Sequence, residues 1–253
     1  MTRVAGGWFE PPAPRVLAHR GLALEAPENT LAAFEAAVRA GAQYLETDIH
    51  PSADGAAVLA HDPTLRRVAG RPESVSDLSL DALRGVDLGG GHGFATLDEL
   101  LHAFPEVRLN VDVKTDAAVA PTVDAVRRAG AADRVLLTAF SDARRRRLAD
   151  AVPGSVTSAG RTSVLRAVAA SRTRSSGAMR RGVAGARALQ IPERVGRLRI
   201  LSPALIETAH AAGLEVHVWT VNDEGDMRRL LDLGVDGLVT DRADLALRVV
   251  SGI

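Results

Sequence analysis

Cysteine is absent from this chain of 253 residues. Its absence excludes disulfide bonds and every metal site built on thiolate ligands. Long hydrophobic runs are also missing, since none reaches the ~20 residues that a membrane-spanning helix needs. The first residues, MTRVAGGWFEPPAPR, lack the apolar core of about 7–15 residues found in signal peptides. We therefore expect a soluble, cytoplasmic protein without stable membrane insertion.

The chain also lacks an excess of either charge, because 31 basic and 31 acidic residues give a formal net charge of zero. No bulk attraction to nucleic acid follows, and we expect no nucleic-acid partner. Lysine is scarce: the 31 basic residues include a single lysine, Lys114. A lysine retained in a chain that otherwise uses arginine suggests a position that needs a compact point charge. The sequence leaves the oligomeric state open.

What the chain does contain is a regular alternation of strand-like and helical segments. Short apolar runs such as RVLAH (15–19) precede segments whose apolar residues have helical spacing. The eight strand-like runs cover residues 15–19, 42–50, 107–114, 134–140, 154–160, 186–192, 214–222 and 235–241. Eight such units without a linker predict an α/β fold, a (β/α)8 TIM barrel forming one domain over residues 1–253. An open doubly wound sheet is the alternative, but it needs fewer repeats, and no G-x-G-x-x-G follows the first strand.

One interval, residues 50–106, is too long for a simple strand-to-helix loop. It contains a possible hairpin (ADGAAVLAHDPTL), three consecutive glycines at 89–91 and a helical pattern near 96–104. We expect a small insertion between the second and third strands, on the face where the strands end. Long structured loops in compact domains usually serve a function.

Charged residues gather where the predicted strands end, and in a barrel this end carries the active site. Glu46 and Asp48 are two residues apart and therefore share a strand face, as do Asp112 and Lys114, while Asp241 ends the eighth strand. Several unpaired carboxylates in one place are costly. A divalent cation removes that cost, and oxygen ligands suit Mg²⁺, Ca²⁺ or Mn²⁺ rather than zinc. The alternative is that the carboxylates pair with arginines from the loops.

The charges at this end favour an anionic substrate. Three carboxylates set against a divalent cation, Lys114 and Arg20 leave about one positive charge, which suits a phosphodiester monoanion. His19 ends the first strand, and His61 lies early in the interval 50–106. Two imidazoles on opposite sides of a phosphate can act as general base and general acid.

Four segments resemble the glycerophosphodiester phosphodiesterase family: AHRG, PENTLAAFEAAVRAGAQYLETDIHPSADGAAVLAHDPTL, LNVDVK and VWTVNDEGDMRRLLDLGVDGLVTDRADLA. The resemblance extends over residues 15–249. It implies a TIM barrel with a small insertion after the second strand. It also implies hydrolysis of a small-molecule glycerophosphodiester to glycerol 3-phosphate and an alcohol, with a divalent cation (Mg²⁺ or Ca²⁺, or Mn²⁺). The implied roles are acid and base for His19 and His61, metal ligands for Glu46, Asp48 and Asp112, phosphate binding for Arg20 and Lys114, and contact with the glycerol end for Trp219.

Asp112 departs from the family pattern, which usually has glutamate at this position. Aspartate is one methylene shorter, so the ion must shift or a water must bridge the gap. Glu28 of the PENT segment is expected near the site, and Asn29 or Thr30 is expected to cap the first helix. Two alternative functions remain open: a lysophospholipase D-like phosphodiesterase, and a catalytically silent phosphate-binding barrel.

The segment 151–192 contains seven arginines and no acidic residue. We interpret it as solvated helix faces. The alternative is that part of it lies at the cavity mouth and attracts anionic head groups or a lipid surface.

Overall fold

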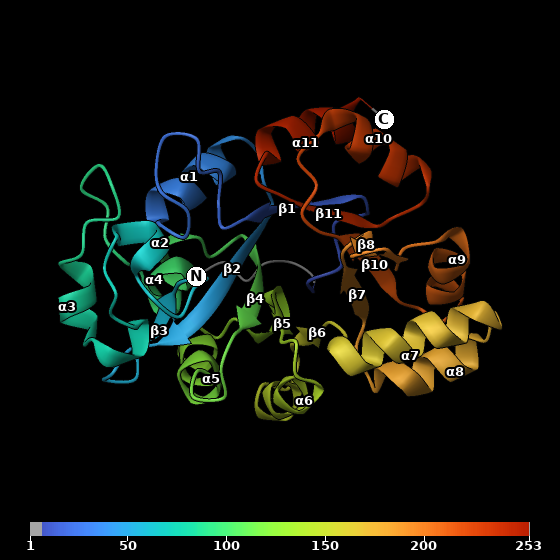
Figure 1. Ribbon diagram of the computed structural model, residues 1–253, viewed down its shortest axis with the longest axis horizontal. Coiled ribbons are helices and arrows are strands. Elements are labelled where there is room, and N and C mark those ends of the chain that lie inside the picture. Colours follow the sequence, from blue (N-terminus) through green and yellow to red (C-terminus); the bar gives the residue numbers. More distant parts are fainter. Residues whose placement is uncertain (1–6, 253) are drawn as a thin grey trace.

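The computed structural model describes residues 7–252. Eight parallel strands form a nearly closed barrel with helices around it (Figure 1). The order around the barrel is β6-β5-β4-β2-β1-β11-β10-β7, and a parallel bridge between Ser158 and Ala188 joins the two ends. This closure confirms the predicted barrel and excludes the open sheet. The barrel strands are β1 (Arg15–His19), β2 (Tyr44–Pro51), β4 (Arg108–Val113), β5 (Val135–Thr138), β6 (Val156–Thr157), β7 (Ala188–Ile191), β10 (Glu215–Val218) and β11 (Gly237–Thr240).

Each barrel strand is followed by a helix, as the alternation in the sequence predicts. These helices are α1 (Leu31–Arg39), α4 (Leu97–Ala103), α5 (Val119–Arg128), α6 (Asp142–Ala151), α7 (Arg161–Arg172), α9 (Pro203–Ala211), α10 (Glu224–Asp232) and α11 (Ala243–Ser251). Helix α1 begins after Thr30, whose side chain accepts a hydrogen bond from the Ala33 amide. Thr30 is therefore the cap, while the neighbouring Asn29 accepts a hydrogen bond from the Thr47 hydroxyl.

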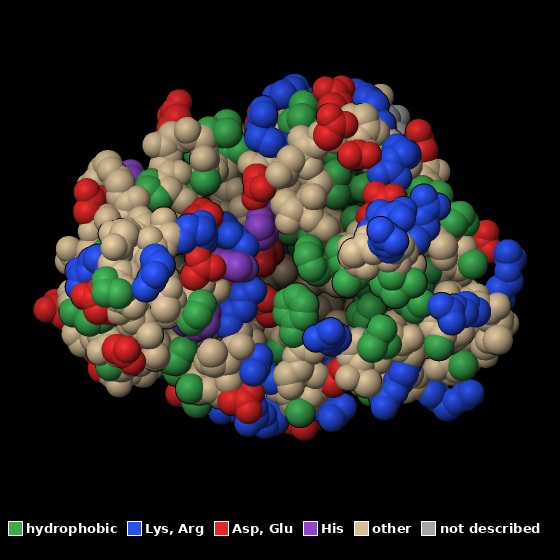
Figure 2. All heavy atoms as spheres, in the orientation of Figure 1, with side chains coloured by type: hydrophobic (Ala, Val, Ile, Leu, Met, Phe, Trp, Pro, Cys, Tyr) green, Lys and Arg blue, Asp and Glu red, His purple; other side chains and the backbone are tan. Residues whose placement is uncertain are grey.

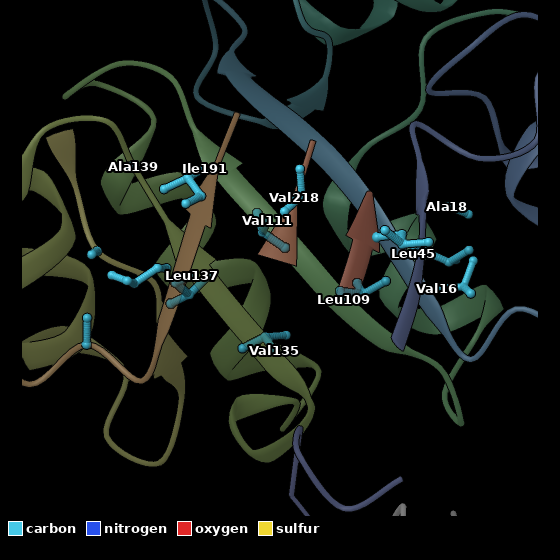
Figure 3. Close-up of a cluster of buried hydrophobic side chains, with 14 of the residues drawn as sticks. Val16, Ala18, Leu45, Leu109, Val111, Val135, Leu137, Ala139, Ile191 and Val218 are labelled. Carbon is cyan, nitrogen blue, oxygen red and sulfur yellow. The ribbon is translucent and has the colours of Figure 1, made fainter. Parts of the chain in front are cut away.

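The strand alternation divides the apolar residues between two cores. Val16 and Leu45 belong to the large core, with helix residues such as Phe34; Figure 3 shows this cluster. The intervening residues, such as Leu17 and Tyr44, face the barrel interior and pack with other residues of a second cluster. The same alternation turns polar residues inward near the strand ends, and this places the site.

The segment between β2 and α4 forms a lobe beside the barrel. Strand β3 (Ala57–Leu59) pairs antiparallel with the end of β2, which makes the expected hairpin. The turn of helix α2 (Arg66–Ala69), a 3-10 turn (Val75–Asp77) and α3 (Leu80–Arg84) follow. A separate apolar cluster holds the lobe together, and its buried members are Val58, Ala60, Leu65, Val75, Leu83, Val86 and Phe94.

Two elements were not expected from the sequence: helix α8 (Ser176–Val183) and the hairpin of β8 (Arg194–Val195) and β9 (Leu198–Arg199). Helix α8 lies between α7 and β7, at the end of the fifth unit, and the hairpin follows β7 in the sixth unit. Along residues 7–252, no helix is long and apolar enough to cross a membrane.

Candidate active site

A cavity of about 660 Å³ opens at the carboxyl ends of the barrel strands. In Figure 2 it is the hollow near the centre of the face, with histidine and charged side chains on its left and hydrophobic side chains on its right. All eight residues proposed from the sequence line it: His19, Arg20, Glu46, Asp48, His61, Asp112, Lys114 and Trp219. Six of them come from β1, β2 and β4 or the residues directly after these strands.

A tight turn after β1 delivers the first two of these side chains. Arg20 has φ of 58° and Gly21 has φ of 90°, so the chain reverses as soon as the strand ends. The Arg20 amide donates to the Glu46 carbonyl at 2.9 Å, which fixes the turn to β2. A Cβ on Gly21 would lie 2.6 Å from the carbonyl carbon of Ala33. Glycine is therefore required at this turn by both its φ and the approach of α1.

Asp241 orients the imidazole ring of His19. The Nδ1 of His19 lies 2.6 Å from Asp241 Oδ1, and Asn222 donates to the other oxygen of Asp241 at 2.7 Å. Burial lowers the pKa of His19, but the hydrogen bond to Asp241 and the negative charges of Glu46 and Asp241 together outweigh it, so the net shift is upward. The Nε2 of His19 points toward the cavity and lies 3.9 Å from Glu46 Oε2.

His61 has the same kind of partner from a different part of the chain. Its Nδ1 lies 2.7 Å from Asp62 Oδ1, and Arg67 donates to the second Asp62 oxygen at 2.5 Å. Arg67 also donates to both oxygens of Glu28, which in turn accepts from Arg20 at 3.1 Å. Burial raises the pKa values of Asp62 and Glu28, but the hydrogen bonds they accept and the positive charges of neighbouring arginines together outweigh it and lower both. This chain of charges ties the lobe to the turn after β1.

The carboxylates lie side by side on neighbouring strands, and cations separate them. Asp48 is in register with Asp112. The Nζ of Lys114 lies 2.6 Å from Asp48 Oδ1 and 2.5 Å from Asp112 Oδ2. Arg20 Nε is 3.0 Å from Asp48 Oδ2, close enough for an ion pair although not aligned for a hydrogen bond. Asp48 therefore also has an arginine partner, which is the alternative expected for these carboxylates.

Burial is the largest single influence on the pKa values of Glu46, Asp112 and Lys114. Burial, followed by the charge of Asp48, raises the pKa of Glu46 to about 8. Burial also raises the pKa of Asp112, against the opposing effect of Lys114. Burial lowers the pKa of Lys114, but Asp112 and Asp48 outweigh it, so the net shift is upward and the ammonium stays charged.

The carboxylate oxygens of Glu46, Asp48 and Asp112 are the candidate ligands of the predicted divalent cation. Within residues 7–252, no three His, Asp or Glu side chains are arranged as a metal site. Lys114 lies between Asp48 and Asp112. Among the described residues, each predicted ligand nevertheless keeps one buried oxygen without a hydrogen-bond partner: Glu46 Oε2, Asp112 Oδ1 and Asp48 Oδ2, the last of which lies 3.0 Å from Arg20 Nε. Buried orphaned oxygens are unfavourable, and a hard cation is the partner that three carboxylate oxygens suit. The residues therefore fit a divalent cation.

The floor and the far wall of the cavity come from other strands. On the floor, the Gln190 amide donates to Asn110 Oδ1 at 2.8 Å. On the wall, Trp219 and Phe140 meet edge to face with ring centroids 6.3 Å apart. The remaining apolar lining includes Val164, Leu165, Ile191, Val195, Leu198 and Ile200.

Five residues of the site were not predicted from the sequence: Asp62, Arg67, Asn110, Gln190 and Asn222. Asn110 and Gln190 had a signal, because Asn110 is two residues before Asp112 on the same strand face and Gln190 lies inside a predicted strand. Asp62 follows His61 directly in LAHDPTL. No local pattern indicated that Arg67 contacts Glu28, 39 residues away, or that Asn222 contacts Asp241, 19 residues away.

Comparison with known proteins gives a consistent result. The model of the glycerophosphoryl diester phosphodiesterase family matches residues 19–245. A Mycobacterium tuberculosis protein named probable glycerophosphodiester phosphodiesterase 2 is 39% identical over 90% of this chain and 88% of its own length. The structure of a glycerophosphodiester phosphodiesterase from Agrobacterium tumefaciens is 27% identical, with a TM-score of 0.75 over 94% of this chain and 99% of that chain. An Oleispira antarctica phosphodiesterase, solved in complex with the product sn-glycerol-3-phosphate, shares the fold at 22% identity, with a TM-score of 0.78 over 94% of this chain and 97% of that one.

Proposed function

We propose a mechanism for the reaction in this cavity. Its premise is that this chain belongs to the glycerophosphoryl diester phosphodiesterase family and is an enzyme that hydrolyses glycerophosphodiesters. The observation that carries the proposal is the pairing of His19 and His61, each oriented by an aspartate, with cationic side chains at one cavity. In both rings Nδ1 is engaged by the aspartate, so Nε2 is the nitrogen available for proton transfer. The expected products are glycerol 3-phosphate and an alcohol.

Arg20 and Lys114 bind the phosphate in this proposal. Both side chains line the cavity, and Lys114 keeps its charge because Asp48 and Asp112 stabilise it. Fixed cations near the non-bridging oxygens stabilise the additional charge that develops when phosphorus is attacked. Trp219 offers an apolar ring face to the glycerol end.

Glu46, Asp48 and Asp112 hold the divalent cation, and their orphaned oxygens support this assignment. A bound divalent cation supplies Lewis-acid stabilisation of phosphoryl oxygens. The oxygen donors favour a hard divalent cation, and Mg²⁺, Ca²⁺ and Mn²⁺ all belong to this class.

The two histidines act as the general base and the general acid of the reaction. One accepts a proton from the attacking hydroxyl, and the other donates a proton to the oxygen of the leaving group. The attacking hydroxyl belongs either to water or to the neighbouring carbon of the substrate glycerol, in which case a cyclic phosphate forms and water then opens it. A substrate analogue without that glycerol hydroxyl separates the routes, because only direct attack by water leaves its full activity.

A lysophospholipid is a second candidate substrate, because it has the same phosphodiester and an additional acyl chain. The apolar wall of the cavity favours it, since Phe140, Val164 and Ile191 leave room that a small polar alcohol does not fill. Comparing kcat/KM for glycerophosphocholine and lysophosphatidylcholine distinguishes the two substrates.

The test of the proposed function is hydrolysis of glycerophosphocholine and glycerophosphoethanolamine by the purified protein, before and after treatment with EDTA. We expect release of glycerol 3-phosphate, its loss with EDTA, and recovery when Mg²⁺, Ca²⁺ or Mn²⁺ is added back. Undiminished activity of the EDTA-treated and dialysed protein would refute the role of the cation. Absence of any hydrolysis with every cation would refute the proposed activity and would favour a silent binding barrel.

A further inference from the structure

Large hydrophobic side chains are exposed mainly at the cavity mouth. Among residues 7–252, five of them expose more than half of their surface, and four of these line the cavity: Phe140 (60%), Leu165 (55%), Val195 (59%) and Leu198 (51%). Single exposed apolar residues need no explanation, but a group of them around one opening marks an interaction surface. The hydrophobic side chains to the right of the hollow in Figure 2 lie on this side of the mouth.

The β8–β9 hairpin supplies two of these residues and surrounds them with positive charge. Residues 194–199 are all exposed, and Arg194, Arg197 and Arg199 alternate with Val195 and Leu198 around the turn. None of these arginines forms an ion pair with a carboxylate of residues 7–252; Arg194 only approaches the Arg197 carbonyl at 3.4 Å.

Neighbouring acidic charge does not neutralise the hairpin. Glu193, the acidic residue beside it, is paired with Arg229 at 2.8 Å. Arg161, at the start of α7, is also exposed and lines the mouth. The hairpin therefore carries three uncompensated positive charges next to two exposed aliphatic side chains.

We infer that this face of the mouth docks on an anionic lipid bilayer. The Val195 and Leu198 side chains enter the interfacial layer, and the arginines meet lipid phosphates. An anionic bilayer has negatively charged lipid head groups above its hydrocarbon layer, which matches the β8–β9 hairpin because the hairpin is both basic and apolar. A second copy of this chain would instead bring like charges together, so self-association fits the surface less well. The inference goes beyond the proposed hydrolysis and does not depend on it, because docking involves no turnover.

The experiment is co-sedimentation of the full chain with vesicles of phosphatidylglycerol and phosphatidylcholine, and with vesicles of phosphatidylcholine alone, at low and high salt. We expect binding to the anionic vesicles at low salt and its loss at high salt. Arg197→Gln/Arg199→Gln should weaken binding about 30-fold, from the usual effect of a basic side chain at an anionic surface. Val195→Ser/Leu198→Ser should weaken it at least about tenfold.

The matched control removes two arginines from the other end of the barrel. Arg146 and Arg187 are exposed and lie beside the start of β6 and β7. Arg146→Gln/Arg187→Gln should bind vesicles like the wild type if docking uses the hairpin. Equal losses in the control and the hairpin variants would mean that only net charge matters, and would overturn the inference.

Two further outcomes also contradict the docking surface. One is a failure of the wild type to bind anionic vesicles at low salt. The other is a wild-type dimer in sedimentation velocity that Leu198→Ser converts to a monomer, which would make the face an interface between copies. Hydrolysis of water-soluble glycerophosphocholine is measured in parallel, and Arg197→Gln/Arg199→Gln should retain it, so loss of docking and loss of catalysis stay distinguishable.

Discussion

At the scale of single residues, the two histidines share a design but differ in how easily the sequence reveals it. His19 was predictable because it ends a strand, and in a parallel barrel every strand ends on the same face. Asp241, which orients His19, was predictable at this face because it also ends a strand. His61 lies in the lobe, so its place at the cavity depends on how β3 pairs with β2, and the Arg67–Glu28 contact behind it depends on the folded lobe.

The first prediction concerns the histidines themselves. His19→Ala and His61→Ala should each lower kcat by about 10²–10⁴-fold, because each removes one proton-transfer group. Cation binding, followed by calorimetry, should be retained in both. His102→Ala is the control, since His102 is exposed on α4 and bonds only the Asp98 carbonyl among the described residues. An active His19→Ala enzyme would remove this residue from the mechanism.

The second prediction concerns the residues that position His61. Asp62→Asn and Arg67→Ala should lower kcat by about 10–100-fold with a smaller change in KM, because losing a partner that fixes an imidazole has this size of effect at other sites. Arg67→Lys should recover part of the loss, since one of the ion pairs can re-form. Arg71→Ala is a matched control, because Arg71 pairs at the surface with Glu73 and with no other carboxylate among residues 7–252. Equal kcat in Arg67→Ala and Arg71→Ala would show that the chain of charges does not orient His61.

At the scale of elements, the long periodic segments were predictable and the short ones were not. The limits of β1 agree with the RVLAH run, and α1 begins at the predicted cap. Strands β8 and β9 have two residues each, too few for an alternation to be recognised. Helix α8 was missed because its eight residues, SGAMRRGV, include two glycines and few apolar side chains.

The turn after β1 gives the third prediction. Gly21→Ala should lower the free energy of unfolding by about 2–5 kcal/mol, because a positive φ and a clash with the Ala33 backbone act together. Gly55→Ala is the matched control: Gly55 also has a positive φ, of 82°, but a Cβ there would meet nothing within 4 Å. Its cost should be only about 1–2 kcal/mol. Urea titration of both variants measures the difference, and equal costs would mean that α1 does not pack tightly on this turn.

At the scale of the whole molecule, a series of polar side chains extends through the barrel interior. It begins at the lower end of the barrel, where the strands start, and reaches the cavity floor. Arg15 at the start of β1 donates two hydrogen bonds of 2.7 Å to Glu215, and Glu215 lies 2.9 Å from His217. The next contacts are Gln190 and then Asn110 on the floor. Trp8 is buried nearby, and its indole donates to the Leu109 carbonyl. Trp8 and Leu109 are 101 residues apart and Arg15 and Glu215 are 200 apart, so no local pattern could predict these two contacts.

The pair of the buried Arg15 and the partly buried Glu215 should make the fold sensitive to acid. Burial raises the pKa of Glu215, but hydrogen bonds from Arg15 and His217 outweigh it and lower the pKa to about 2, from 4.5 for the ordinary group. A carboxylate with a depressed pKa in the folded state stabilises the protein above its unfolded pKa. That contribution is lost as the pH falls from 4.5 toward about 2. It amounts to about 3 kcal/mol at neutral pH.

Glu215→Gln tests this argument, because glutamine keeps the size of the side chain but cannot ionise. The variant should be less stable than the wild type at pH 7 by about 3 kcal/mol, and the gap should narrow as the pH approaches 3, in urea titrations at each pH. The control is Glu35→Gln, whose partner Arg39 is 3.5 Å away with both side chains more than half exposed. An exposed pair of this kind contributes at most about 1 kcal/mol, so its effect should be small at every pH. A gap for Glu215→Gln that stays constant from pH 7 to pH 3 would show that the glutamine substitution acts through packing and that the ionised pair is not what stabilises the lower end of the barrel.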